Sequence, residues 1–569
     1  MPKKKPKPMP DASGRMPVSA SLPPATGIRH PASLALVLAI CLIALAAVRI
    51  VATYPETGLT WDEPAYLACG LQYMAQHVYR YVVQHPPLAL LMSALGPYLD
   101  GVRPLNAQNF YLEGVAEMYR SGHPERELYL MRLGILPFFL LAASVVYLWA
   151  RRHFGNAVAV VSTGLFTVLP PVLAHGGLAT TDMPLTGCLA AAFFALLLWA
   201  EEPTWKHSLL LGITTALAVV SRFTALGFLP AAAVFALLAY IVVERPGISG
   251  LSAAAKARAL PFGLAVITGA VAIWAVYSFS FGKALGWNVS LPAPELFDGV
   301  SFALAHNSTG HPGYLLGAVR TTGWWYFFPV VLSVKTPAGF LLLLGIGTGR
   351  CWAQRGKLVY WLPLAFSMGI LMPAISSKVN IGVRHILPVY AGFSIVAAIA
   401  VVDLVRRAQT RHLAGLGAGL AAAALVVWIV VSGAAQHPNY LAYFNEARWL
   451  RSPENILVDS DLDWGQDTIR LARRLKELGA TQVNFNTLNQ TADRLMVWPG
   501  FPPVQDINPV KPAEGWTAVS PTMWKVSQYG LEHRYPNLEP WFAYLKPVER
   551  VGAYLLYYLP PGSIPPQQR

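Results

Sequence analysis

The sequence predicts an α-helical polytopic membrane protein with about eleven transmembrane helices, followed by a small α/β domain. Three observations predict this class. Of the 569 residues, 54% are hydrophobic and only 13% charged, about half the charged share of an ordinary soluble domain. Apolar runs near twenty residues, long enough to cross a hydrocarbon core of roughly 30 Å, recur between Pro31 and Gly433. Beyond Gly433 the composition changes to mixed charges and aromatic residues.

The basic residues indicate topology rather than nucleic-acid binding. The formal net charge is +14, but Lys and Arg cluster in short segments between the apolar runs. Residues 1–30 are Lys- and Pro-rich, which predicts a disordered cytoplasmic tail. The run from Pro31 to Val51 is longer than the apolar core of a signal peptide, so we expect it to be retained as a first transmembrane helix. We expect the protein in the cell inner membrane, with its N-terminus in the cytoplasm.

This orientation divides the chain into three parts. A transmembrane catalytic domain is expected over residues 31–433, with exported loops at about 53–128 and 282–321. Lys335-Thr336-Pro337 interrupts the eighth apolar run, which predicts a broken or re-entrant helix. Residues 434–569 should form an exported α/β domain, with strands at 456–458 and 483–485 and a helix capped by Asp467 between them.

Asp62 and Glu63 are adjacent carboxylates just beyond the first predicted span. A solvated loop pair is the simplest interpretation. The alternative is a general base whose pKa is raised by its acidic neighbour and by partial burial. Asp182 lies in Thr180-Thr181-Asp182-Met183-Pro184 at the start of the fourth predicted span, where an ordinary helix start competes with a catalytic role.

Several basic residues are predicted on the exported side, against the positive-inside rule. They are His85, Arg222, Lys378, Arg384 and His385. Snorkelling explains any one of them, but several in separate turns indicate a site for an anion such as phosphate. Carboxylates facing such a cluster could deprotonate an acceptor hydroxyl while the cations stabilise a leaving phosphate. That chemistry is glycosyl transfer from a polyprenyl-phosphate sugar.

The chain resembles glycosyltransferase family 39 of the GT-C superfamily, which includes the protein O-mannosyltransferases and the bacterial lipid A aminoarabinose transferases. The resemblance covers most of the chain. Its motifs are Thr60-Trp61-Asp62-Glu63-Pro64, Gln84-His85-Pro86-Pro87-Leu88, Thr181-Asp182-Met183-Pro184-Leu185, Ser221-Arg222-Phe223-Thr224-Ala225, Gly310-His311-Pro312-Gly313-Tyr314-Leu315, Arg384-His385-Ile386-Leu387-Pro388 and Asp463-Trp464-Gly465-Gln466-Asp467.

The resemblance implies a role for each matched residue. Asp62 would be the general base, with Glu63 beside it as its tuner or as a metal or acceptor contact, and Asp182 the second acid. His85, which replaces a Lys of some relatives, would contact the carrier phosphate together with Arg222, Lys378, Arg384 and His385. His311 and Tyr314 would belong to a substrate loop. Such enzymes invert the anomeric carbon in one displacement.

The expected partners are a polyprenyl-phosphate sugar donor and a lipid, glycan or protein acceptor, with no nucleic acid. No cofactor is expected to be required. A divalent metal held by His306 and His311 with Asp62 or Asp182 is possible but not indicated, because no helical His pair is present. The acidic run 459–467 lacks the Gly and Glu of an EF-hand loop. A transporter or flippase of lipid-linked sugars and a non-catalytic membrane scaffold are the alternative functions.

Overall fold

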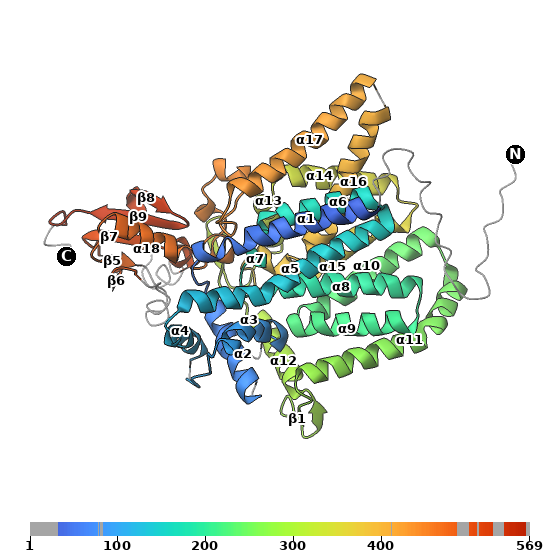
Figure 1. Ribbon diagram of the computed structural model, residues 1–569, viewed down its shortest axis with the longest axis horizontal. Coiled ribbons are helices and arrows are strands. Elements are labelled where there is room, and N and C mark those ends of the chain that lie inside the picture. Colours follow the sequence, from blue (N-terminus) through green and yellow to red (C-terminus); the bar gives the residue numbers. More distant parts are fainter. Residues whose placement is uncertain are drawn as a thin grey trace.

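The computed structural model describes residues 32–77, 79, 84–107, 109–410, 412–485, 500–508, 511–526 and 540–564. The predicted tail, residues 1–30, lies outside this part of the chain. The described residues form a bundle of long apolar helices with a small sheet at one end, which confirms the predicted fold class (Figure 1). The first residues of α1 lie at the other end of the bundle, far from the sheet.

The bundle helices follow the predicted apolar runs. They are α1 (Ala32–Val51), α5 (Pro124–Phe154), α6 (Asn156–Val168), α7 (Pro170–Gly176), α8 (Asp182–Glu201), α9 (Trp205–Ser221), α10 (Ala225–Glu244), α11 (Gly247–Val276), α13 (Phe327–Lys335), α14 (Ala338–Ala353), α15 (Leu362–Ile375), α16 (Val389–Thr410) and α17 (His412–Ala435). In α8 and α16, 78% of the most apolar window is buried, against 11% in α10 and α11. The first two are therefore central, and the last two present their apolar side chains to lipid.

Within the described residues, eight helices are long and apolar enough to cross a membrane, or up to ten if each bent pair counts as one span. The protein is thus a multi-pass membrane protein. The predicted fifth span corresponds to α9, which has only 17 residues and is not among those ten. The broken eighth span is confirmed, because α13 and α14 meet at 116° around Lys335 to Ala338. A second bend, of 68°, separates α6 from α7.

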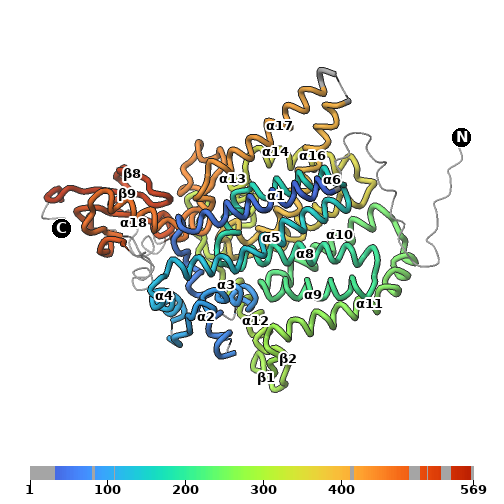
Figure 2. The backbone as a smooth tube through the Cα atoms, viewed as in Figure 1, coloured from blue at the N-terminus to red at the C-terminus, as the bar shows by residue number. Residues whose placement is uncertain are grey.

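Two connections between bundle helices carry structure of their own. Between α1 and α5 lie the 3-10 turn Tyr54–Glu56 and the helices α2 (Glu63–Gln76), α3 (Pro87–Leu99) and α4 (Phe110–Arg120). Between α11 and α13 lie β1 (Phe281–Lys283), β2 (Ser290–Pro292), α12 (Pro294–Thr309), β3 (Gly313–Leu315) and β4 (Ala318–Arg320). Figure 2 shows α2 and α4 at the same end of the bundle as the C-terminal sheet.

The C-terminal sheet has five strands in the order β6-β5-β7-β9-β8. The strands are β5 (Val483–Phe485), β6 (Val504–Asp506), β7 (Gly515–Val519), β8 (Glu549–Val551) and β9 (Tyr554–Leu559). β5 is parallel to β6 and β7, whereas β9 is antiparallel to β7 and β8. Helix α18 (Thr468–Glu477) packs Leu471 and Leu475 against this sheet.

The strand predicted at 456–458 is wrong. Ile456, Leu457 and Val458 form no strand and instead bury their side chains, the first two in the main hydrophobic core. Their apolar character reflects burial beneath the sheet domain and not period-two pairing. The predicted strand at 483–485 and the helix after Asp467 are confirmed.

Candidate active site

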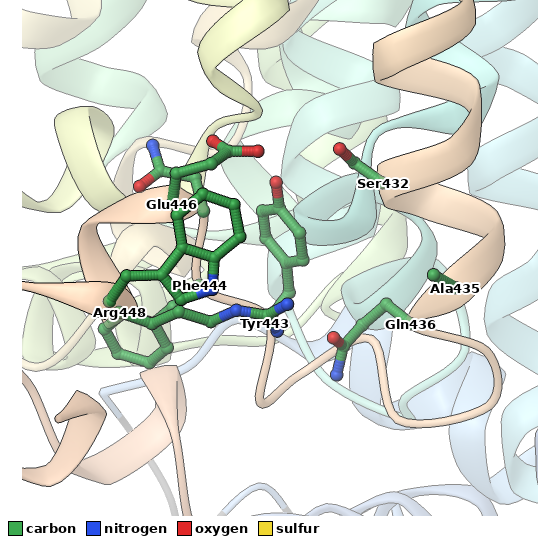
Figure 3. Close-up of a pocket in the computed structure, with 9 residues that line it drawn as sticks. Ser432, Ala435, Gln436, Tyr443, Phe444, Glu446 and Arg448 are labelled. Carbon is green, nitrogen blue, oxygen red and sulfur yellow. The ribbon is translucent and has the colours of Figure 1, made fainter.

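A cavity of about 940 Å³ lies where the bundle meets the C-terminal segment. Side chains from the first loop, from the ends of α9, α10 and α15, from α12 and from the C-terminal segment all line it. Its volume is near the upper end of the range for small-molecule sites. A second cavity, of about 100 Å³, lies beside the end of α17 and is lined by none of the site residues predicted from the sequence (Figure 3).

Asp62 lies on the cavity wall at the start of α2. Glu63 and Pro64 are the first two residues of the helix, which places Asp62 at its N-cap position. Asp62 Oδ2 accepts a hydrogen bond from Arg384 Nη1 at 2.8 Å and one from Tyr66 Oη at 3.3 Å. No described residue donates a hydrogen bond to Oδ1, and the side chain keeps 18% of its surface accessible. One oxygen of this carboxylate therefore remains available to a ligand.

Glu63, the next residue, has the opposite environment. It is fully buried, and its two oxygens form a bidentate ion pair with Arg132 of α5, each at 2.8 Å. The backbone N–H groups of Thr60 and Ala179 donate to the same two oxygens at 2.9 Å. Glu63 does not line the cavity, so the structure does not support a contact with acceptor or metal. Arg132 is not among the residues predicted from the sequence, although a charged residue inside a predicted span itself indicates a functional or paired position.

Asp182 is also completely buried and does not line the cavity. Its Oδ1 pairs with Arg222 Nη1, and its Oδ2 accepts a hydrogen bond from Thr180 Oγ1 at 3.1 Å. Arg384 Nη1 lies 3.9 Å from the same Oδ2. Asp62, Arg384, Asp182 and Arg222 thus form a row of alternating charge. The carboxylates raise the pKa of Arg384 above its usual range, although burial opposes this shift.

Two histidines complete the polar side of the cavity. His85 Nε2 lies 3.3 Å from Tyr66 Oη, while Nδ1 has no hydrogen-bond partner among the described residues. Burial, and next the charge of Arg222, lowers the pKa of His85 to about 4. The pKa of His385 is held well below its usual value by burial and then by Arg222 and Arg384. Its buried Nε2 likewise has no partner among the described residues.

Of the other predicted site residues, one lines the cavity and two do not. His311 lines the cavity, with its ring centroid 6.0 Å from that of His306. Lys378 does not line it, because its exposed side chain donates to Ser308 O at 3.0 Å and ties its turn to α12. Tyr314 is buried in β3 and is not part of the wall. The predicted roles of Lys378 as a phosphate ligand and of Tyr314 in a substrate loop are therefore not supported.

The segment Trp464-Gly465-Gln466 holds the Asp62 loop from the other side. Trp61 N donates to Trp464 O at 3.0 Å, and Gly58 N donates to Gln466 O at 2.8 Å. Gly465 has φ of +99°, and a Cβ atom there would lie 2.8 Å from Leu59 O, so this close approach requires glycine. The Arg384 guanidinium stacks on the Trp464 ring at 4.1 Å. The contact between the Asp62 loop and the Trp464 segment was not predicted from the sequence, because about 400 residues separate the two segments.

The acidic run 459–467 forms a 3-10 turn (Asp459–Asp461) and the start of α18. Asp467 is at the N-cap position, but its side chain does not cap the helix. It is instead fully buried, pairs with Arg470 and accepts hydrogen bonds from Asn439 Nδ2 and Ala553 N. Among the described residues, no three His, Cys, Asp or Glu side chains are grouped so as to hold a metal ion.

Comparisons with known proteins give one partial family match. Residues 129–255 match the family model of dolichyl-phosphate-mannose-protein mannosyltransferase, which bears out, over this part of the chain, the resemblance predicted from the motifs. The matched region includes most of α5, all of α6–α10 and part of α11, and therefore Arg132, Asp182 and Arg222. No curated protein matches the chain.

The structure is also similar to solved structures at low identity. ArnT from Cupriavidus metallidurans, in the apo state and bound to undecaprenyl phosphate, shows 15% identity over 92% of this chain and 98% of that chain, with a TM-score of 0.49. The archaeal oligosaccharyltransferase AglB from Archaeoglobus fulgidus shows 13% identity over 70% of this chain and 55% of that chain, with a TM-score of 0.44. We draw no conclusion from likenesses of this strength.

Proposed function

We propose that the protein is an inverting glycosyltransferase. It moves a sugar from a polyprenyl-phosphate donor to a hydroxyl of a lipid, glycan or protein acceptor at the outer face of the cell inner membrane. The free Oδ1 of Asp62 on the cavity wall carries this proposal. The partial match to the mannosyltransferase family model supports it.

Asp62 is the acid best suited to act as the general base. A base must reach the proton that it removes, which requires an accessible oxygen within hydrogen-bonding distance of the acceptor. Asp62 lines the cavity and has such an oxygen, whereas Glu63 and Asp182 are fully buried and outside its lining. In this proposal Glu63 and Asp182 are positioning residues, the first for α2 and the second for Arg222 and Arg384.

The reaction is a single displacement. The acceptor oxygen transfers its proton to Asp62 Oδ1 and forms a bond to the anomeric carbon. The bond between that carbon and the phosphate oxygen breaks, and its electron pair leaves with the polyprenyl phosphate. Arg222 and the rings of His85 and His385 surround the position expected for the leaving phosphate, where preorganised donors stabilise developing negative charge.

The polyprenyl chain has a suitable place at the apolar end of the same cavity. This part is lined by Phe223 just before α10, by Leu226 and Phe228 in the first turn of α10, and by Leu304 of α12. Leu226 is 46% exposed and Leu304 is 66% exposed although both face the cavity, so this end is open at the surface of the bundle. A lipid-linked donor could enter here from the bilayer with its phosphate leading toward Arg222.

The test is transfer of labelled sugar from a panel of undecaprenyl-phosphate sugars to a total membrane extract. We expect Asp62→Asn to lower the rate about 10²–10⁴-fold, the usual contribution of a general base. The matched control is Asp100→Asn, which changes a carboxylate that pairs with Arg126 outside the cavity. Transfer by Asp62→Asn within twofold of wild type would contradict the proposal. Lipid translocation without transfer by the wild type would favour a flippase.

The proposed displacement needs no metal, because Arg222 and Arg384 already supply positive charge beside the reacting groups. We therefore expect protein treated with a chelator and then desalted to transfer sugar at the untreated rate. Loss of activity that returns on addition of Mg²⁺ or Mn²⁺ would contradict this part of the proposal.

A further inference from the structure

The C-terminal segment supplies a wall of the cavity that takes no direct part in the proposed displacement. Asp459, Asp463, Trp464, Ser520, Thr522 and Tyr554 are on this wall. It faces the reacting groups directly, because Trp464 stacks on Arg384, which in turn binds Asp62. A ligand held against this wall would therefore lie beside the proposed general base.

Asp463 is the central polar group of the wall. It is 3% exposed, its Oδ2 accepts a hydrogen bond from Ser520 Oγ, and its Oδ1 accepts one from Gly465 N at 3.4 Å. Thr522 Oγ1 donates to Asp463 O at 2.6 Å and accepts from Asp459 N at 2.8 Å. The two hydroxyl residues thus fix the backbone and the carboxylate of the 459–463 turn. A side chain held this firmly is preorganised for a ligand.

Asp463 also lacks the partner that a buried carboxylate normally has. No Lys, Arg or His of the described chain lies within 4 Å of it, whereas the neighbouring Asp467 pairs with Arg470. Burial raises the pKa of Asp463 to about 6, against which the Ser520 hydrogen bond acts only in part. A buried, unpaired carboxylate on a cavity wall is costly to the fold and is typical of a functional site.

Aromatic rings accompany these carboxylates. Trp464, Phe485 and Tyr554 line the wall, and the rings of Phe485 and Tyr554 are 5.5 Å apart. Carboxylates that accept hydrogen bonds, next to aromatic faces that pack against C–H groups, suit a sugar ring, which carries both kinds of group. The part of the lining formed by Leu226 and Phe228 suits an isoprenoid chain instead.

We propose that Asp463 and Asp459, positioned by Ser520 and Thr522, form a hydroxyl-binding subsite that takes a sugar ring of a substrate. The inference rests on the proposed function, because a lipid-linked donor or a glycan acceptor would bring the sugar to this wall. Asp463 accepts hydrogen bonds from the sugar hydroxyls, and Trp464 lies beside the ring. The C-terminal segment then contributes to sugar specificity while the bundle contributes the phosphate site and the base.

The test compares ligands with and without a sugar on the purified full-length protein in nanodiscs. One arm measures the Kd of farnesyl phosphate against farnesyl phosphate linked to mannose, glucose or aminoarabinose. The other arm measures binding of methyl mannoside and methyl glucoside to protein saturated with farnesyl phosphate. The variants are Asp463→Asn and Ser520→Ala, and Glu549→Gln, an exposed carboxylate of the same domain, is the control.

We expect wild type to bind at least one sugar-bearing ligand more tightly through its sugar. Asp463→Asn should weaken that binding about tenfold and leave farnesyl phosphate unchanged, consistent with the loss of a hydrogen bond to a charged group. Ser520→Ala should act in the same direction by a smaller factor and serves if Asp463→Asn fails to fold. An effect in the first arm assigns the subsite to the donor sugar, and one confined to the second arm assigns it to an acceptor sugar.

The inference is overturned if the sugar adds nothing to binding by wild type, or if neither variant changes that gain. Failure of the proposed function has a different signature. Wild type would then not bind farnesyl phosphate at all, whereas the methyl glycosides would still report on the subsite in protein without lipid.

Discussion

Two loops of this protein, residues 57–63 and 459–467, combine buried and cavity-lining carboxylates in the same way. Each carries an acid that is buried and fully bonded and at least one acid that lines the cavity; in the second loop both Asp459 and Asp463 line it. Glu63 pairs with Arg132 and Asp467 with Arg470, whereas Asp62 and Asp463 line the cavity. The loops also bind each other through Trp61 N–Trp464 O and Gly58 N–Gln466 O.

The two kinds of acid in these loops differ in their role. One kind fixes the backbone of the loop, and the other is available to a ligand. A carboxylate whose oxygens each accept two or more hydrogen bonds, as those of Glu63 and Asp467 do, fixes the backbone and has no lone pair left for a ligand. A carboxylate with an open oxygen, or without a cation, gains its missing partner when a ligand binds. Asp62 and Glu63 are adjacent and Asp463 and Asp467 are four residues apart, so sequence spacing alone does not distinguish their roles.

The largest effect is expected where the holding acid of the first loop is removed. Glu63→Gln leaves the Arg132 guanidinium buried and unpaired, which we expect to cost about 3–5 kcal/mol of unfolding free energy. Thermal unfolding in detergent measures this loss. Asp62→Asn is the matched comparison and should cost less, because Asp62 is partly exposed and Arg384 keeps Asp182 and Trp464 as neighbours. Equal losses in the two variants would show that the acids do not differ.

A smaller effect is expected at the contact between the loops. Gly465→Ala places a Cβ atom 2.8 Å from Leu59 O at a φ of +99°, which should cost about 1–3 kcal/mol through backbone strain. Because the strained contact is next to Asp62, the rate of sugar transfer should fall further than the folded fraction does. Gly500→Ala, at a similar φ of +90° but with nothing within 4 Å of its added Cβ, is the control for backbone strain alone and should leave transfer per folded molecule unchanged. A variant with wild-type stability and transfer would mean that the loops need not touch.

The stacked pair Arg384–Trp464 tests the same contact through a side chain. Trp464→Leu removes an interaction of about 0.5–2 kcal/mol that holds Arg384 beside Asp62. We expect kcat to fall about 3- to 30-fold, a change that Trp464→Phe partly restores. Trp449→Leu, at a tryptophan that is 75% exposed, should leave kcat unchanged. A change in KM for the donor with constant kcat would assign Trp464 to binding alone.

The smallest effect is a pH dependence of phosphate binding. The pKa of His85 in the free protein is about 4, because of burial and Arg222, with Asp62, Arg384 and Asp182 also nearby. A bound phosphate favours the charged ring, so it raises this pKa, and binding takes up a proton at pH values between the two. The affinity for farnesyl phosphate should therefore rise as pH falls, by up to about tenfold per pH unit.

The reference for this slope is the double variant His85→Gln/His385→Gln, which retains the titration of the phosphate and of the other cavity groups, such as Asp463. Isothermal titration at several pH values measures the difference. Identical slopes for wild type and the double variant would place the phosphate away from both rings.

Much of the fold could be predicted from sequence because it follows from local periodicity. Long apolar runs predicted the bundle helices, and Lys335-Thr336-Pro337 predicted the break between α13 and α14. The prediction of a strand at 456–458 was wrong because it also relied on a local signal. A short apolar run does not distinguish a strand from a buried turn. Within the described part, such local signals were sufficient for the helix bundle but gave only β5 of the five-stranded sheet.

The site could be predicted only in outline. The motifs predicted that one site contains several acidic and basic residues that do line the same cavity: Asp62, His85, Arg222, Arg384, His385 and His311. Which acid holds and which is free depends on partners far away in sequence, such as Arg132 for Glu63 and Asn439 for Asp467. The exposed position of Lys378 likewise follows from the packing of α12, which no short motif encodes.

Chemical rescue of Asp62→Ala by azide tests the central claim most directly. Azide attacks the anomeric carbon without losing a proton, so it does not need a general base, and the shorter side chain leaves it room. We predict that Asp62→Ala transfers almost no sugar to its natural acceptor but forms a glycosyl azide of inverted configuration from an undecaprenyl-phosphate sugar. A variant that binds farnesyl phosphate normally yet forms no glycosyl azide, or one that still transfers sugar at the wild-type rate, would contradict the assignment of Asp62 as the base.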